Sequence, residues 1–389
     1  MAPETVGGPR WLEPALQVVR ARYFGGPQPE ERGDDAWLRA IAAARTERLG
    51  PVLSEAASHL GVELPRSGWA ALAADRLANE ERYAAQLEAL DDLGPRIEGR
   101  GVPAAIIKGP ALARHYPVAA VREAADIDLL VPSDALSAAE ACLNECGFRR
   151  WSSGGRPATR YAVTYARAAD GGLQVAVDLH PRWHEIRIEP DGETARIGGR
   201  EATLGRTGLG QIRWRVLPPA AELYLASAHA ILSSLRTISV YLDLAVLMHA
   251  AGSEAVDWAA ATARETGRDR HLRHATTLAA ELFGLEMAWE LRSRPARLGV
   301  PTGLRLGHVA PGARFLPSSL LMELVLRRGW KRKLDFVRWV LGHRGRTARA
   351  ARAAPEDGAR RWLGKLAGLR WLKGSLLRYR RPGSTALRS

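Results

Sequence analysis

The chain has 389 residues, of which 46% are hydrophobic and 25% are charged, and its formal net charge is +14. This length and composition exclude a disordered chain and allow two or three domains with cores of their own. The N-terminus lacks a secretory pattern and no apolar run approaches the roughly 18 residues of a membrane span, so we expect a cytoplasmic protein.

Residues 1–99 predict an N-terminal helical region. Three helix-like stretches cover 11–24, 34–60 and 67–97, and Gly- and Pro-rich joins separate them. In the third stretch, apolar residues recur at roughly helical spacing, which predicts packing rather than chemistry. These residues are Leu72, Leu77, Tyr83, Leu87 and Leu90.

Residues 100–217 alternate between strand, helix and turn patterns, and the first strand, 102–107, ends at Lys108. The next residue, Gly109, lets the backbone approach a ligand closely, and Pro110 suits the first turn of a helix that we expect to reach Tyr116. Free amides and the helix dipole at that end favour an anion. Lys108 adds a full positive charge there.

Two carboxylates follow in a second apolar strand. Alternate side chains leave the same face of a strand, so Asp126 and Asp128 project together while Ile127 and Leu129 turn to the core. Carboxylates that share a small volume repel each other unless a hard divalent cation bridges them. The pair predicts Mg²⁺, with Mn²⁺ as the alternative, and Arg122 could add positive charge against a triphosphate.

A third carboxylate is expected from a β-hairpin. Residues 161–167 and 173–179 have strand patterns, and Asp170-Gly171-Gly172 between them suits a tight turn. Asp178 then lies on the more polar face, with His180 one step beyond. Three carboxylates on two strands can hold two cations about 3.5–4 Å apart. The Gly- and Arg-rich stretch 186–216 has no clear period and predicts loops with short strands.

Other residues that could bind metal have simpler explanations. Cys142 and Cys146, the two cysteines, lie four apart on a predicted helix, which matches no zinc or redox motif and predicts packed or surface thiols. Pro181 lies between His180 and His184, so the helical two-histidine zinc geometry is excluded.

The order of these motifs resembles a known family. The chain is similar to the uncharacterised nucleotidyltransferase family of the DNA polymerase beta-type superfamily. The similarity rests on this order of motifs: a strand, a Lys-Gly turn, a helix, an Arg-x-x-x-Asp-x-Asp strand and a later strand ending Val-Asp-Leu-His. The resemblance covers residues 30–290, and its specific part is 102–180. It implies an α+β fold, in which a small mixed β-sheet core with helices on one face is flanked by N-terminal and C-terminal helical regions.

The resemblance also implies an activity, the transfer of a nucleoside monophosphate from an NTP with loss of pyrophosphate, and two Mg²⁺ ions. Many members have Gly-Ser or Gly-Gly at the phosphate turn, where this chain has Lys-Gly. His180 matches the family's Val-Asp-Leu-His pattern and has either an acceptor-side role or a structural hydrogen bond. The residues that match the carboxylate positions and the glycine of the phosphate turn are Asp126, Asp128, Asp178 and Gly109.

Residues 218–326 predict a helical domain with helix patterns at 220–235, 239–251, 256–267 and 270–284. Such a domain could form one side of the cleft that binds a nucleotide or an acceptor. Its polar residues His229, Arg236 and Asp243 either face that cleft or form hydrogen bonds between helices.

Positive charge is concentrated in the last segment. Residues 327–389 hold 19 Lys and Arg against 3 Asp and Glu, whereas residues 1–326 hold 37 against 39. Within this tail, 331–342 and 360–379 predict basic amphipathic helices with interleaved aromatic residues. Such helices can bind an anionic partner, which would be RNA, an acidic peptide or a membrane surface, or can form a solvated cap with a packed face.

The sequence therefore predicts four regions: 1–99 (helical), 100–217 (catalytic), 218–326 (helical) and 327–389 (basic tail). We expect a nucleotidyltransferase that uses ATP as its first donor and modifies a hydroxyl or phosphate of an unidentified acceptor, a peptide or a small metabolite. Two other hypotheses remain open, a noncatalytic nucleotide-binding module and a phosphotransferase that uses the same metal site. The expected metal ligands are Asp126, Asp128 and Asp178, and the expected nucleotide-binding residues are Lys108, Gly109 and Arg122.

Overall fold

The computed structural model describes residues 12–151, 162–168, 174–183, 185–231 and 237–286. Several sequence predictions lie outside these residues, namely those for the basic tail 327–389, the turn Asp170-Gly171-Gly172, His184 and Arg236. In the described part of the chain, no helix is both long enough and apolar enough to cross a membrane.

The N-terminal region is helical, as predicted, but its middle stretch forms two helices rather than one. The chain leaves helical geometry after Thr46, and Arg48 takes a positive φ of 59°. Pro51 lies in the first turn of the next helix, where its missing N–H costs no hydrogen bond. The helices are α1 (Glu13–Phe24), α2 (Asp34–Thr46), α3 (Gly50–Leu60) and α4 (Arg66–Gly99).

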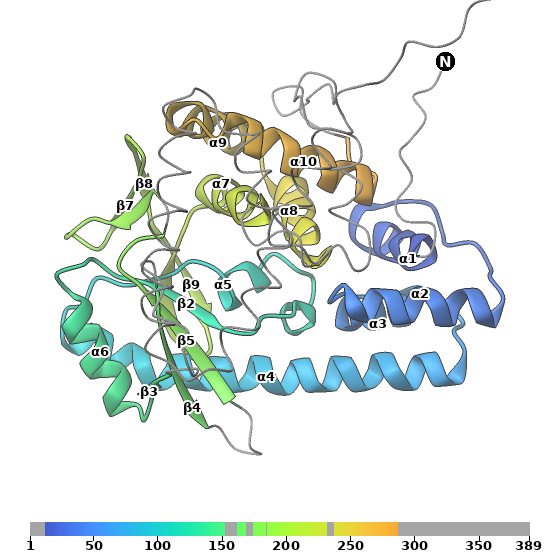
Figure 1. Ribbon diagram of the computed structural model, residues 1–389, viewed down its shortest axis with the longest axis horizontal. Helices are drawn as coiled ribbons and strands as arrows, with labels where there is room; N and C mark the ends of the chain where they lie inside the picture. The colour runs from blue at the N-terminus through green and yellow to red at the C-terminus, as the bar shows by residue number, and fades with distance from the viewer. Residues whose placement is uncertain (1–11, 152–161, 169–173, 184, 232–236, 287–389) are drawn as a thin grey trace, which may run out of the picture.

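Helix α4 runs along one side of the molecule (Figure 1). Its first half packs on α2 and α3, and its second half packs on the sheet. The predicted packing face holds for Leu72 and Leu90, which are buried, but is wrong for Leu77, which is 57% exposed. Five residues after Leu72, Leu77 lies about 140° further around the helix, on the solvent side.

The central sheet is mixed, with the strand order β3-β4-β5-β2-β1-β10-β9. Only two of its pairings are parallel, β2 with β5 and β1 with β10. The predicted hairpin is confirmed by the antiparallel pairing of β4 with β5. The strands are β1 (Ala105–Ile106), β2 (Ile127–Leu130), β3 (Arg149–Arg150), β4 (Val163–Ala168), β5 (Gln174–His180), β9 (Gly205–Leu209) and β10 (Ile212–Val216).

The stretch 186–216 contains more order than its composition predicts. It supplies β9 and β10 of the main sheet and a second sheet of three antiparallel strands. Trp214 and Val216 of β10 alternate into the core, a signal that the surrounding Arg and Gly residues obscure. The small sheet comprises β6 (Ile186–Ile188), β7 (Thr194–Ile197) and β8 (Arg200–Thr203).

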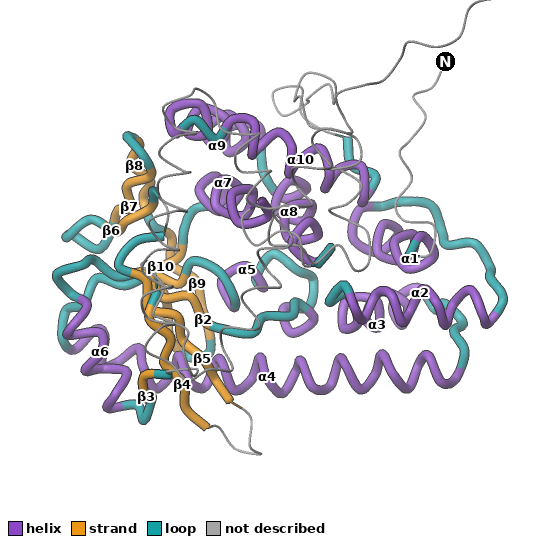
Figure 2. The backbone as a smooth tube through the Cα atoms, viewed as in Figure 1, coloured by secondary structure: helices purple, strands orange, loops and turns teal. Residues whose placement is uncertain are grey.

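One face of the main sheet is covered by α4 and by α6 (Leu136–Glu145), which confirms the predicted α+β arrangement with helices on one face (Figures 1 and 2). Ile127 and Leu129 of β2 join this core. Both cysteines are buried on α6, where Cys142 Sγ donates to the Arg96 carbonyl at 3.4 Å, so they are packed thiols. On the opposite face, Ala105 and Leu130 join a second hydrophobic cluster, and Asp128 and Asp178 lie on that same side of their strands.

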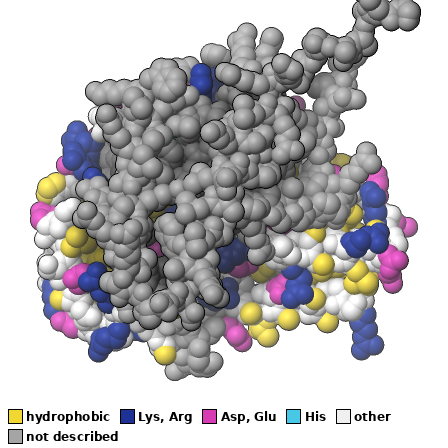
Figure 3. All heavy atoms as spheres, in the orientation of Figure 1, with side chains coloured by type: hydrophobic (Ala, Val, Ile, Leu, Met, Phe, Trp, Pro, Cys, Tyr) yellow, Lys and Arg dark blue, Asp and Glu magenta, His cyan; other side chains and the backbone are white. Residues whose placement is uncertain are grey.

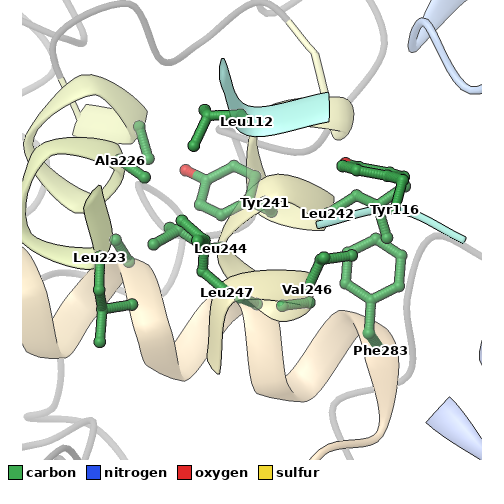
Figure 4. Packing of buried hydrophobic residues seen from close by; sticks show 14 of the residues in the cluster. Leu112, Tyr116, Leu223, Ala226, Tyr241, Leu242, Leu244, Val246, Leu247 and Phe283 are labelled. Carbon is green, nitrogen blue, oxygen red and sulfur yellow. The ribbon is translucent and has the colours of Figure 1, made fainter. Parts of the chain in front are cut away.

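The C-terminal helices are α7 (Pro219–His229), α8 (Ser239–Ala250), α9 (Ser253–Thr266) and α10 (Asp269–Phe283). They share one hydrophobic cluster with α1, α2 and α3, although the two sets are far apart in the sequence. In Figure 4, two residues from the middle of the chain lie against this cluster, Leu112 beside Tyr241 and Tyr116 beside Leu242 and Phe283. The helices at the two ends of the described chain therefore form one body.

Polar contacts reinforce this joint. Arg20 of α1 donates to the carbonyl of Leu282 in α10, with Nη2 at 2.7 Å. The buried Glu47 carboxylate accepts the backbone N–H of Ile238, which precedes α8, at 2.9 Å. Around the margin of the view in Figure 3, where described residues are visible, Lys and Arg side chains are dispersed among Asp and Glu.

Removing the Glu47 carboxylate should destabilise the protein. The Ile238 amide is a helix-start donor without a helical partner, and Glu47→Ala would leave it buried and unsatisfied. We expect the free energy of unfolding to fall by about 1–3 kcal/mol in a denaturant titration, and by less for Glu47→Gln, which keeps an acceptor. Unfolding free energies within about 0.5 kcal/mol of wild type would contradict this contact.

Candidate functional site

The face of the main sheet opposite α4 and α6 carries a compact polar cluster. In the parallel pair of β2 and β5, Asp128 is in register with Asp178, and Leu130 with His180. Because residues two apart share a face, Asp178 and His180 lie together, and Asp128 lies beside them. One ligand atom from each of Asp128, Asp178 and His180 lies within 4.8 Å of the other two.

Asp128 is the centre of this cluster and is 2% exposed. Lys108 Nζ lies 3.1 Å and His180 Nε2 lies 2.9 Å from Asp128 Oδ1. Burial disfavours the charged form of Asp128, but the positive charge of Lys108 and the hydrogen bond from His180 outweigh it and hold the pKa well below its usual value. These contacts favour the ionised form of Asp128.

The turn after β1 places Lys108. Strand pairing continues past β1, because the Ile107 amide donates to the Asp128 carbonyl at 3.1 Å, and this brings the next residue beside Asp128. Lys108 Nζ also lies 5.4 Å from the ring centroid of Trp183, a cation–π distance. The predicted positive charge at this turn thus faces the predicted carboxylates.

Asp178 is held by a residue that sequence reasoning did not single out. Thr164 of β4 is in register with Asp178, and its hydroxyl donates to Asp178 Oδ1 at 2.6 Å. The alternation of the predicted hairpin was the available signal, since it places Thr164 on the same face as Asp178. The bond orients one carboxylate oxygen and leaves the other for a ligand.

Asp126 lies next to this cluster, directly before β2. Burial and the neighbouring charge of Asp128 raise the pKa of Asp126 to about 6, although Lys108 opposes them. Among the described residues, the group with metal-binding distances pairs Asp128 and Asp178 with His180, and Asp126 is outside it. The sequence predicts Asp126 within the strand, whereas β2 begins one residue later, at Ile127.

Gly109 is required by the geometry of its turn. Its φ is 58°, and a Cβ built on it would lie 2.5 Å from the Asp126 carbonyl oxygen. The helix that follows, α5 (Pro110–Ala113), is one turn long, so the predicted extension to Tyr116 is wrong. Pro117 disfavours helical geometry at Tyr116. A single turn has little dipole, so Lys108 provides most of the positive charge here.

Arg122, which follows the 3₁₀ helix η1 (Ala119–Val121), has an internal partner. Its Nε and Nη2 atoms donate to the two carboxylate oxygens of Asp243 in α8, each at 2.8 Å. Its Nη1 atom donates to the Gly109 carbonyl at 2.9 Å. The sequence predicts this cation against the triphosphate, whereas the structure places it behind the turn in an ion pair.

Helix α4 holds the loop that carries Arg122. Asn79 and Gln86, each 2% exposed, donate to the carbonyls of Ala120 and Ala124. They lie seven residues apart on the helical face of Leu72, and polar residues on that apolar stripe were a signal in the sequence.

His229, at the end of α7, has its ring centroid 6.0 Å from that of Trp183.

This donor set fits a divalent cation. Carboxylate oxygens bind Mg²⁺ and Mn²⁺, and an imidazole is better suited to Mn²⁺ than to Mg²⁺. Burial, and after it the negative charge of Asp128, raises the pKa of Asp126, and a cation bound there would relieve the repulsion between the two carboxylates.

The family model described as "Uncharacterised nucleotidyltransferase" matches residues 33–284, more than half of the chain. The chain belongs to this family. The protein is therefore a nucleotidyltransferase, a transferase enzyme, as the resemblance predicts. The match runs from α2 to α10 and so includes the helices on both sides of the sheet.

Two further comparisons add little. No curated protein was found to match the chain. Among solved structures, the chain is similar to the solution structure of the antibiotic-resistance factor ANT(2'')-Ia, with 15% identity, a TM-score of 0.35, and coverage of 47% of this chain and 93% of that one. A likeness at this level carries no argument about substrates.

Substituting Gly109 tests the close approach at the turn. Ala at a positive φ costs about 1–2 kcal/mol by itself, and we expect Gly109→Ala to lose at least about 1 kcal/mol more because its Cβ meets the Asp126 carbonyl. Gly101→Ala is the matched control, since Gly101 has a φ of 60° and no atom within 4 Å of its Cβ position. Denaturant unfolding of both variants gives the difference, and equal losses would refute the clash.

Proposed function

We propose that this nucleotidyltransferase transfers a nucleoside monophosphate from an NTP, with ATP the first donor to test, to a hydroxyl or phosphate of an acceptor, releasing pyrophosphate. The observation that supports it most is the cluster of Asp128, Asp178 and His180 with Lys108 at its edge. A peptide or a small metabolite is the acceptor class we would test first. Mass analysis of the product distinguishes this transfer from phosphorylation, since the acceptor gains AMP rather than phosphate.

The carboxylates have distinct roles in this proposal. Asp128 and Asp178, on adjacent strands, would hold the metal, with Asp126 as the third carboxylate next to them. Bound Mg²⁺ or Mn²⁺ supplies positive charge that stabilises the transition state of phosphoryl transfer. Asp178, oriented by Thr164, is placed to take the proton of the acceptor oxygen as that oxygen bonds to the α-phosphorus and pyrophosphate leaves.

Lys108 and His180 shape the electrostatics around Asp128. Lys108 would bind the triphosphate, because its ammonium group lies at the edge of the cluster on the phosphate turn, next to Gly109. His180 would orient Asp128 through its 2.9 Å contact or serve as a metal ligand. Transfer stabilised by preorganised charges of this kind needs no covalent enzyme intermediate.

Neutralising the ligands should abolish turnover. Asp128→Asn and Asp178→Asn each remove a charge where the metal binds, so we expect Mg²⁺-dependent pyrophosphate release to fall at least about 10²-fold. Asp126→Asn should show a loss in the same direction. Asp92→Asn is a suitable control, because Asp92 pairs with Arg167 at the edge of the helix-covered face, and it should keep wild-type activity. Wild-type turnover in Asp128→Asn would refute the metal site, provided that thermal unfolding shows a folded protein.

Replacing Lys108 should weaken nucleotide binding. A charged hydrogen bond to phosphate is worth about 1.5–3 kcal/mol, so Lys108→Ala should raise the dissociation constant of ATP with Mg²⁺ by about 10- to 100-fold in calorimetric titrations. Lys108→Arg keeps the charge and should lose less. Unchanged ATP affinity in Lys108→Ala would show that this side chain serves only to neutralise Asp128.

A further inference from the structure

A buried ion pair links the phosphate turn to the helical region. Arg122 and Asp243 are 121 positions apart and meet through two hydrogen bonds of 2.8 Å. Both side chains are nearly buried, with exposed fractions of 11% and 12%. A two-bond Arg–carboxylate pair fixes distance and orientation together, and breaking it leaves a charge without a partner away from water.

A third donor completes the carboxylate environment of Asp243. The Tyr116 hydroxyl donates to Asp243 Oδ1 at 2.7 Å. Burial and the neighbouring Asp243 charge raise the pKa of Tyr116 well above its usual value, so it remains a donor. Figure 4 shows the Tyr116 ring beside Leu242 and Phe283, in the helical core. Asp243 therefore holds both Arg122 and the segment after α5.

Arg122 passes this constraint to the phosphate turn. Its Nη1 atom donates to the Gly109 carbonyl, while the Asp126 carbonyl oxygen occupies the space that a Cβ on Gly109 would need. Burial disfavours a charged guanidinium, but Asp243 outweighs it and keeps the Arg122 pKa above its usual value. The turn is thus fixed by a permanent ion pair on one side and by the acidic segment on the other, and Lys108 is the residue next to it.

We propose that Asp243 is a positioning residue for nucleotide binding: through Arg122 it holds the Gly109 turn in the geometry that presents Lys108 and the turn amides to the triphosphate. This inference rests on the proposed function. It gives Arg122 a role through the turn rather than on the phosphates, and it makes helix α8 part of the nucleotide site. Tyr116 is the second positioning residue, because it holds Asp243 in place.

A second buried cluster provides a matched control. Glu55 accepts two hydrogen bonds from Arg22, at 3.0 and 2.8 Å, and one from the Tyr23 hydroxyl, at 3.0 Å. It has the same three chemical groups as the Asp243 cluster and similar burial. Arg22 and Tyr23 lie on α1 and Glu55 lies on α3. The Tyr23 ring packs against the Tyr116 ring, with centroids 6.0 Å apart, but Arg22 donates to Glu55 instead of to the phosphate turn. Glu55→Gln and Asp243→Asn should therefore cost similar stability but differ in ligand binding.

The test measures ATP affinity and turn mobility in the full chain. We expect Asp243→Asn to bind ATP with Mg²⁺ about 10-fold more weakly than wild type in calorimetry, because the turn is misplaced. Without nucleotide, hydrogen exchange of residues 108–113 should be faster in Asp243→Asn. Glu55→Gln should leave both quantities unchanged even where its melting temperature falls equally. Tyr116→Phe keeps the ion pair and should give a smaller loss of affinity, with Tyr23→Phe as its control.

The possible outcomes separate the two proposals. Wild-type protein that binds none of ATP, CTP, GTP and UTP with Mg²⁺ would overturn the proposed function and this inference with it. If wild type binds ATP but Asp243→Asn and Tyr116→Phe bind equally well, or no more weakly than Glu55→Gln and Tyr23→Phe, the inference alone fails. Faster exchange at the turn with unchanged affinity would likewise overturn it. If Asp243→Asn does not fold, the Tyr116→Phe comparison decides the matter.

Discussion

The charge of Asp128 is the constraint around which the site is built. A carboxylate that is 2% exposed remains ionised only if nearby groups compensate its burial, and Asp128 Oδ1 has Lys108 Nζ at 3.1 Å and His180 Nε2 at 2.9 Å. His180 lies on β5 and Lys108 follows the paired segment of β1, so these contacts depend on the pairing of β1, β2 and β5. The α4 and α6 core on the opposite face supports that pairing. The chemistry of the polar cluster thus depends on the apolar packing behind it.

Strand alternation made much of this predictable from the sequence. A period of two places Asp128 and Asp178 opposite the apolar residues of their strands, and the predicted hairpin is borne out by the antiparallel pairing of β4 with β5. Glycine at 109 was also readable, because a positive φ and a close backbone approach exclude a side chain. These features are local, so the sequence around each residue contains the information. The same holds for the helices at both ends, whose apolar periodicity is clear apart from the break near Arg48.

Long-range pairings could not be predicted in the same way. Arg122 beside two aspartates suggests a phosphate-binding cation, and nothing near it in the sequence indicates that Asp243 will neutralise it. Nor could the sequence predict that α1 to α3 share one core with α7 to α10, because the sequence of each helix shows only that it has an apolar face. His180 was recognised by its position after Asp178, but its contact with Asp128 depends on the β2–β5 register. The departures from prediction at the site therefore concern partners, while those elsewhere concern where helices and strands begin and end.

The extent of the family match agrees with a site that depends on distant helices. Residues 33–284 include α8 as well as the strands that carry the carboxylates. If the sheet alone sufficed for nucleotide transfer, the helices would only need to cover apolar surface, and other helices could replace them. The Asp243–Arg122 pair argues against this, because a buried two-bond contact tolerates little displacement of either partner and ends on the backbone of the phosphate turn. Movement of α8 relative to the sheet would be transmitted to Gly109 directly, so the helical region and the acidic cluster act as one unit.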